Sequence, residues 1–309
     1  MRDMVTCFSE HAVRISETTC SSYINQDHQP GLLSNLNPTP SVPNAVIFLY
    51  KAVLLPEQKQ FMITVTWCRN PLGQGGLNIN FGDDPSSASF KLNTFSRLFR
   101  KKKGQKSLEV DSLKVDIYWD LSSATYHSGP EPVDGYYVVV VVNSELTLAL
   151  GDLAHEAVTK RLKTDSSLLS KSVQLVSRRE HYSGNALYST KAQFCDSGIS
   201  HEIMIRCSED HERLKQPVLY VSIDKRTVIK VRRLQWNFRG NQTVFVDGLL
   251  VDLMWDVHDW FFNPLSGSAV FMFKTRSGGE SRLWLEEKLV QKDQERVEFS
   301  LLIYASKSS

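Results

Sequence analysis

The sequence has few cysteines, and they form no recognisable pattern. The five residues are odd in number and widely spaced: Cys7, Cys20, Cys68, Cys195 and Cys207. No CxxC pair or Cys/His spacing indicates a zinc site, and nothing resembles a disulfide framework. We therefore expect free thiols in a reducing compartment, either the cytoplasm or the nucleus.

Long apolar runs are also absent. The start of the chain lacks the apolar stretch of a secretory signal, and the valine run at 138–142 is far shorter than the ~18 residues of a membrane span. We expect no transmembrane segment. Excess charge of one sign is missing too, because the formal net charge is only +2. Any electrostatic argument must therefore depend on local clusters.

Signatures of catalysis and of cofactor binding are missing as well. There is no GxSxG motif, and the GQGG run at 73–76 does not open a helix after a strand, as a nucleotide-binding loop would. Asp256 and His258 would point to opposite faces of a strand and could not share a metal ion. We predict no catalytic residues, no metal and no cofactor.

The sequence does contain a repeated phrase. VDIYWDL begins at Val115 and VDLMWDV at Val251, which are 136 positions apart (251 − 115 = 136). At the same offset Gly104 corresponds to Gly240. With small shifts in offset the match extends over about a hundred residues, so we infer two copies of one unit.

We place these copies at 45–180 and 181–309. Residues 1–44 are rich in Ser, Thr, Asn and Pro, lack periodicity, and are predicted to be a mostly disordered tail. The segment 152–162 has the best helical spacing of apolar residues.

The rest of each copy has the pattern of β-strands. Val115, Ile117 and Trp119 alternate with polar residues, as in a half-buried strand. Asp247-Gly248 between two apolar runs predicts a tight hairpin, and Asp111-Ser112 stands at the matching place. The predicted fold is mainly β: two tandem copies of an antiparallel β-sandwich or barrel-like unit with few helices. Whether the copies share one sheet stays open.

Two longer phrases resemble a known family. They are VDIYWDLSSATYHSGPEPVDGYYVVVVV, from Val115, and WNFRGNQTVFVDGLLVDLMWDVHDW, from Trp236. Both are similar to a plant-specific family catalogued as domain of unknown function 868, over about residues 45–305. The resemblance implies a plant origin and a β-rich fold. It implies no catalytic residue.

The repeated aspartates are weak candidates for catalysis. Asp116 and Asp120 lie four residues apart on one strand face, as do Asp252 and Asp256. At ~3.3 Å per residue the members of each pair are roughly 13 Å apart, too far for one metal ion or one acid–base pair. We expect these side chains to be solvated, to accept turn hydrogen bonds or to pair with basic neighbours.

Two basic stretches are the most informative signal. RLFRKKKGQK (97–106) and KRTVIKVRRLQWNFR (225–239) each hold six Lys or Arg and no acid. They can attract phosphate groups or an acidic partner, and RKKKGQK can serve as a nuclear-import address. The alternative is a solvated hairpin edge whose charges prevent aggregation. The candidate binding residues are Arg97, Arg100, Lys101, Lys102, Lys103, Lys106, Arg232, Arg233 and Arg239.

An aromatic cluster follows the second repeated phrase. Trp260, Phe261 and Phe262 stand together in HDWFFNPLSG, where we expect a loop. Three adjacent aromatics in a loop either pack between the two copies, which we favour, or face a partner.

Three hypotheses for function follow. The first is a non-catalytic interaction module whose basic hairpins bind an acidic protein segment, anionic lipid or nucleic acid. The second is a carbohydrate- or small-ligand-binding sandwich that uses Tyr126, Trp260 and Phe261. The weakest is an enzyme of unrecognised type.

Overall fold

The protein is described by a computed structural model over residues 40–54, 59–69, 75–82, 88–93, 102–162, 173–184, 187–195, 198–210, 216–263, 267–276 and 298–307. The first half contains β1 (Pro43–Leu54), β2 (Lys59–Arg69), β3 (Gly75–Phe81), β4 (Ser89–Asn93), β5 (Lys103–Val110), β6 (Leu113–Asp120), β7 (Thr125–Tyr126), β8 (Pro132–Asp134), β9 (Tyr137–Val142), β10 (Glu145–Leu150) and α2 (Ala154–Leu162). The second half contains β11 (Val173–Ser183), β12 (Leu187–Ala192), β13 (His201–Asp210), β14 (Gln216–Ile223), β15 (Arg226–Val231), β16 (Arg239–Val246), β17 (Leu249–Asp256), α3 (His258–Phe262), β18 (Ser268–Thr275) and β19 (Ser300–Ser306). The mainly β prediction is confirmed, and so is the helix expected near 152–162.

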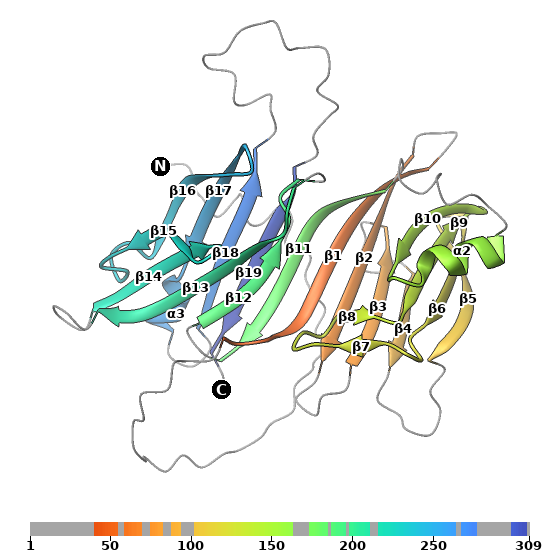
Figure 1. The fold of residues 1–309 in the computed structure, drawn as a ribbon, viewed down its shortest axis with the longest axis horizontal. Helices are drawn as coiled ribbons and strands as arrows, with labels where there is room; N and C mark the ends of the chain where they lie inside the picture. Colours follow the sequence, from red (N-terminus) through yellow and green to blue (C-terminus); the bar gives the residue numbers. More distant parts are fainter. Residues whose placement is uncertain are drawn as a thin grey trace, which may run out of the picture.

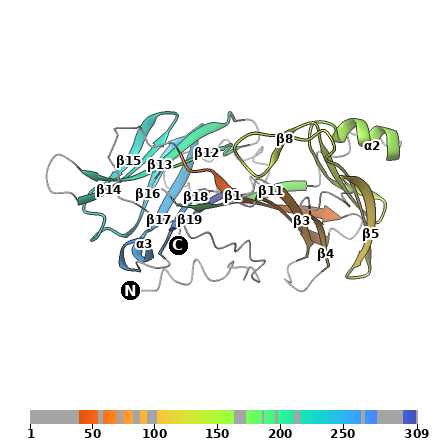
Figure 2. The same cartoon turned by 90° about the horizontal axis from the view of Figure 1, so that it is seen from below.

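One nine-stranded sheet runs through the whole molecule, in the order β16-β17-β18-β19-β11-β1-β2-β3-β4 (Figure 1). Two four-stranded sheets, β10-β9-β6-β5 and β12-β13-β14-β15, cover the same side of it at opposite ends (Figure 2). The question left open by the sequence is therefore answered: both halves contribute strands to one sheet.

Each covered end of the long sheet encloses its own hydrophobic core. The first core lies between β1–β4 and β5, β6, β9 and β10, and it includes Ile63, Trp67, Ile117 and Trp119. The second core lies between β12–β15 and β16–β19, and it includes Ile205, Leu219, Trp255 and Phe271. We call these two ends the first and second units. Their sequence limits, 45–180 and 181–309, stay a prediction.

β9, which contains the valine run, is buried on both faces. Val138, Val140 and Val142 of β9 belong to the first core, while Val139 and Val141 contact α2 on the outside. Ala154 and Val158 of α2 pack there and are almost fully buried. A strand covered on both faces has no reason to alternate between apolar and polar residues.

The repeated phrases form two hairpins of matching geometry. β5–β6 and β16–β17 pair in the same register, with Gly104 opposite Trp119 and Gly240 opposite Trp255. Their turns have left-handed backbone at both central residues, with φ of 49° and 67° at Asp111-Ser112 and 49° and 78° at Asp247-Gly248. These are the dihedral signs of the tight hairpin turn that the sequence predicts. The wider inference of tandem copies over the whole chain stays a prediction.

β11 joins the two units. It pairs antiparallel with β1 and parallel with β19, so it is the one strand between the two halves of the long sheet among the described residues. Its Arg178 donates a hydrogen bond from Nε to Glu180 (2.7 Å) and one from Nη2 to Glu131 (3.0 Å). Glu180 is fully buried and also accepts hydrogen bonds from Tyr182 and Thr190. An ion-pair network thus lies at the junction of the units.

The start of β1 lies earlier than the sequence suggested. Pro43 and Asn44 belong to β1, although the segment 1–44 was predicted to be a tail. Residues 1–39 lie outside the described residues.

Candidate functional site

The repeated aspartates are neutralised in both hairpins. In the first, Asp120 pairs with Lys103 (2.9 Å), and Asp116 accepts a hydrogen bond from Ser107. In the second, Asp256 pairs with Arg239 (2.7 Å), while Asp252 accepts hydrogen bonds from Thr243 and Arg276. The hydrogen bond from Arg276 lowers the pKa of Asp252. The predicted pairing of these carboxylates with basic neighbours is confirmed.

The segment after the second hairpin brings Asp256, His258 and Asp259 into contact. Asp256 accepts a hydrogen bond from the backbone N–H of His258, and His258 Nδ1 lies 2.9 Å from Asp259. Within the described ranges, no group of three or more His, Cys, Asp or Glu side chains is arranged to hold a metal ion.

The described parts of the two basic stretches lie at opposite ends of the molecule. Lys103 and Lys106 are on β5, at the far right of Figure 1, and Lys102 directly precedes them. Arg97, Arg100 and Lys101 lie outside the described residues. β15 and β16, which hold the second stretch, are at the far left in Figure 1 and again in Figure 2. The described residues of the two stretches therefore do not form a common surface.

The second stretch contributes to a surface of cations that have no described counter-charge. We call this the basic surface; its members are exposed and make no ion pair with any residue that the structure describes: Arg206, Lys225, Arg226, Lys230, Arg232 and Arg233. Of the predicted residues, Arg232 and Arg233 belong to it. Arg239 does not, because Asp256 neutralises it.

A row across three strands gathers part of this charge. Arg206, Tyr220 and Lys230 are direct neighbours on β13, β14 and β15. The guanidinium of Arg206 and the ammonium of Lys230 each lie 5.0 Å from the centroid of the Tyr220 ring. The ring attracts both cations, which would otherwise repel each other. An anion bridging them would be stabilised by both charges.

The connection between β15 and β16 is rigid and presents a tryptophan. Leu234 is fully buried, and its N–H donates to the carbonyl of Pro217 (3.2 Å). The N–H groups of Trp236 and Asn237 both donate to the carbonyl of Arg233. The Trp236 side chain is nevertheless 82% exposed. Because hydrogen bonds fix this turn, the exposure is a property of the fold.

The predicted aromatic loop is a short helix, so the expectation of a loop was wrong. Trp260 and Phe261 of α3 are partly buried against the core of the second unit itself. The favoured packing between the copies was therefore also wrong. Phe262 is 56% exposed, and its ring lies 6.0 Å from that of Phe238, next to Arg239. The structure thus places one of the three predicted aromatic residues beside the basic stretch.

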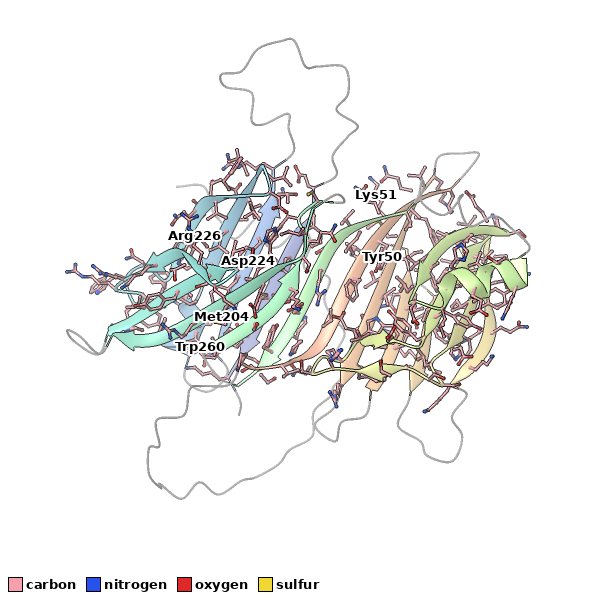
Figure 3. The ribbon with its side chains drawn as sticks, in the orientation of Figure 1. Tyr50, Lys51, Met204, Asp224, Arg226 and Trp260 are labelled. Atoms are coloured by element: carbon pink, nitrogen blue, oxygen red, sulfur yellow. The ribbon has the colours of Figure 1, made fainter. Side chains whose placement is uncertain are left out.

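A histidine links the turn before β15 to the turn after β16, at the end of these two strands that is far from their connection. His201 Nδ1 lies 2.6 Å from Asp224, in the β14–β15 turn, and Nε2 lies 2.8 Å from Asp247, in the β16–β17 turn. Burial by itself lowers the pKa of His201, but the hydrogen bonds to the two carboxylates outweigh it and raise the pKa. Figure 3 shows Asp224 and Arg226 together near this end, while Trp260 lies at the opposite end of the unit. The edges of β15 and β16 are therefore held side by side at both ends.

Sequence reasoning missed Arg206 of the basic surface and the exposed Trp236 beside it. Trp236 stands inside the second basic stretch. A tryptophan between arginines, in a segment that connects two strands, is a sequence signal that could have identified it. Arg206 comes from a different strand, and no local pattern connects it with the stretch at 225–239.

Comparison with known proteins places the chain in a family. A family model described as plant protein of unknown function (DUF868) matches residues 41–307. The chain belongs to this family. Searches of curated proteins and of solved structures found no match. The family extends over both units, and the resemblance seen in the two long phrases is confirmed.

The residues proposed for small-ligand binding are not brought together in this member of the family. Tyr126 is on β7 in the first unit and is 42% exposed, whereas Trp260 and Phe261 pack in the second. No described helix is long and apolar enough to cross a membrane.

Proposed function

We propose that the protein acts by binding, and that its second unit binds an anionic partner through the basic surface. The observation that carries this proposal is the group of six exposed cations, without a described ion-pair partner, beside the exposed Trp236. Two carboxylates at the same edge, Asp224 and Asp247, are already held by His201. The basic surface is thus available to external anions.

Exposure and rigidity both favour recognition over a purely solvating role. Solvating lysines on an edge strand need no aromatic neighbour. Tryptophan and arginine are the residue types that contribute most to protein interfaces, and a preorganised turn lowers the entropy lost on binding. Cytoplasmic or nuclear localisation stays a prediction.

The test is a charge-removal variant of the full chain. We replace Arg226, Lys230, Arg232 and Arg233 with serine and measure binding to polyglutamate, to a dT oligonucleotide and to phosphatidylserine vesicles at several salt concentrations. The wild type should bind at least one probe, and the variant should bind it about tenfold or more weakly with a shallower salt dependence.

A matched control removes equal charge from the first unit, at Lys51, Lys91, Lys102 and Lys106. This control should retain most of the binding. Failure of the wild type to bind any probe, or equal losses in both variants, would refute the proposal.

A further inference from the structure

β5 and β16 are edge strands with the same exposure pattern but different chemistry. Among the described residues each pairs with its hairpin partner alone, and their side chains are exposed and buried at matching positions. At three exposed positions β5 carries Lys103, Lys106 and Glu109, and β16 carries Arg239, Gln242 and Phe245.

Charge on an edge strand normally prevents another strand from pairing with it. β5 retains this protection along its length. In β16 the two later positions hold the neutral Gln242 and the aromatic Phe245, so this part of the strand lacks protective charge. Among the described residues β16 has β17 as its single neighbour, which leaves one row of backbone N–H and C=O groups without a strand partner.

The exposed face of β16 also offers an apolar contact. Phe245 is 72% exposed, near the end of the strand that His201 links to β15. Trp236 lies just before the other end. A segment lying along β16 could thus contact one aromatic side chain near each end.

The neighbouring edge strand, β15, supplies positive charge. β15 runs beside β16, because His201 links their turns at one end and residues 232–238 connect them at the other. Arg226 and Lys230 lie on β15, and Arg232 and Arg233 directly follow it. Side chains on one face of a strand added to β16 would approach Arg226, Arg232 and Arg233.

We propose that β16 accepts an extended acidic polypeptide segment as a tenth strand of the long sheet. This inference rests on the proposed function and names the class of partner. Strand addition takes its affinity from backbone hydrogen bonds and its specificity from alternate side chains. Here Glu or Asp at alternate positions would meet the basic surface, and apolar residues between them would contact Phe245.

Other occupants fit this edge less well. Nucleic acid and lipid have no polypeptide backbone with which to complete a strand edge. A second copy of the chain, paired through its own β16, would bring two basic surfaces together, and like charges in an interface are costly.

The test places two residues of β5 at the matching positions of β16, without changing the net charge. Gln242→Lys with Phe245→Glu restores the residues of β5 at both positions, and the two changes cancel in net charge. The probe is a fluorescein-labelled eight-residue peptide of alternating glutamate and valine, matched to the eight residues of β16. A second version carries N-methyl groups on alternate backbone nitrogens, which removes strand hydrogen bonds and keeps the charge.

The full-length wild type should bind the peptide, and hydrogen exchange of the β16 amides should slow when it does. The variant and the N-methylated peptide should each weaken binding about tenfold or more. A second charge-neutral pair, Thr125→Lys with Val133→Glu on the exposed β7–β8 hairpin, should bind like the wild type. Circular dichroism and thermal unfolding confirm that each variant is folded.

Equal binding by the variant, or by the N-methylated peptide, would overturn strand addition. If binding then still depends on Arg226, Lys230, Arg232 and Arg233, the proposed function stands alone. If neither set of changes affects binding, both proposals fall. A wild-type dimer that dissociates in the Gln242→Lys/Phe245→Glu variant would overturn the acidic segment in favour of a second copy.

Discussion

Gly104 and Gly240 each lie beneath the ring of the tryptophan opposite on the next strand. A Cβ added to Gly104 would lie 2.7 Å from Cζ2 of Trp119, and one added to Gly240 would lie closer still to Trp255. These glycines are required by close approach, because no other residue leaves room for the ring. Trp255 is further fixed by a hydrogen bond from Nε1 to the carbonyl of Asn237 (3.0 Å), in the rigid turn that presents Trp236.

Replacement of Gly240 with alanine should lower the free energy of unfolding by about 1–3 kcal/mol, because the tryptophan must move out of its packed position. Gly104→Ala should cost less. Gly129→Ala is the control, since an added Cβ there meets nothing within 4 Å. Urea denaturation measures all three; a Gly240→Ala variant as stable as the control would contradict the packing argument.

His201 makes the stability of the second unit depend on pH. Its folded pKa is raised above the ordinary value of about 6.5, so the protonated ring is favoured in the folded state. This contribution is fully present below pH ~6.5 and is lost as the pH rises through the folded pKa. The pKa of Asp224 is lowered by the hydrogen bond with His201, so its contribution is lost only in acid, as the pH falls through its folded pKa.

The wild type should therefore become less stable over the interval in which the pH rises from about 6.5 through the folded pKa of His201. A His201→Gln variant, which keeps a polar side chain and loses the charge, should show a flatter profile over this interval. Denaturant midpoints at several pH values test this. Parallel profiles for the two proteins would show that His201 is not the titrating group.

At the scale of elements, β11 depends on its buried ion pairs. Burial by itself lowers the pKa of Arg178, but the charges of Glu180 and Glu131 outweigh it and raise the pKa. The carboxylate of Glu180, which accepts hydrogen bonds in this network, has no exposure to solvent. Removing one partner would leave the other charge buried and uncompensated.

Glu180→Leu should lower the free energy of unfolding by about 3–5 kcal/mol. The double variant Arg178→Met/Glu180→Leu should lose less stability than the sum of the two single losses, because the two substitutions remove the same ion pair. A double-mutant cycle by chemical denaturation measures the difference. Additive losses would indicate that the two side chains act independently.

The elements differ in how far sequence predicts them. Alternation in 115–121 and 251–257 predicts β6 and β17, and Asp-Gly or Asp-Ser between apolar runs predicts their turns. β11 escapes such a pattern, because Arg178, Arg179, Glu180 and His181 stand in succession in a central strand. Their environment comes from Glu131, β1 and β19, which are distant in sequence.

The basic surface shows the same limit. Composition identifies the charged stretch at 225–239. It does not show that Asp256 neutralises Arg239, or that Arg206 from β13 joins the surface. Trp119 and Trp255 stand on the apolar sides of the two repeated phrases and are buried, whereas the exposure of Trp236 follows from the turn that fixes it.

At the scale of the whole molecule, the long sheet gives the protein two dissimilar ends. The first ends in β4, covered by a sheet whose free edge β5 is charged. The second ends in β16 and β15, where positive charge lies beside an edge that has no further strand partner among the described residues. Binding at the second end would leave the first end free.

The parallel pairing of β11 with β19 also has a consequence for the order of folding. Ser300 Oγ donates to Ser177 Oγ across a sequence separation of 123 residues, so this pairing must close a long loop. The hairpins and the first core need only nearer partners and can form early. Until β19 pairs with it, β11 would carry an exposed edge in the middle of the molecule, on the strand that holds the buried carboxylate of Glu180. The slow step of folding is thus expected at the seam of the sheet, where a partly synthesised or truncated chain would be most prone to aggregate.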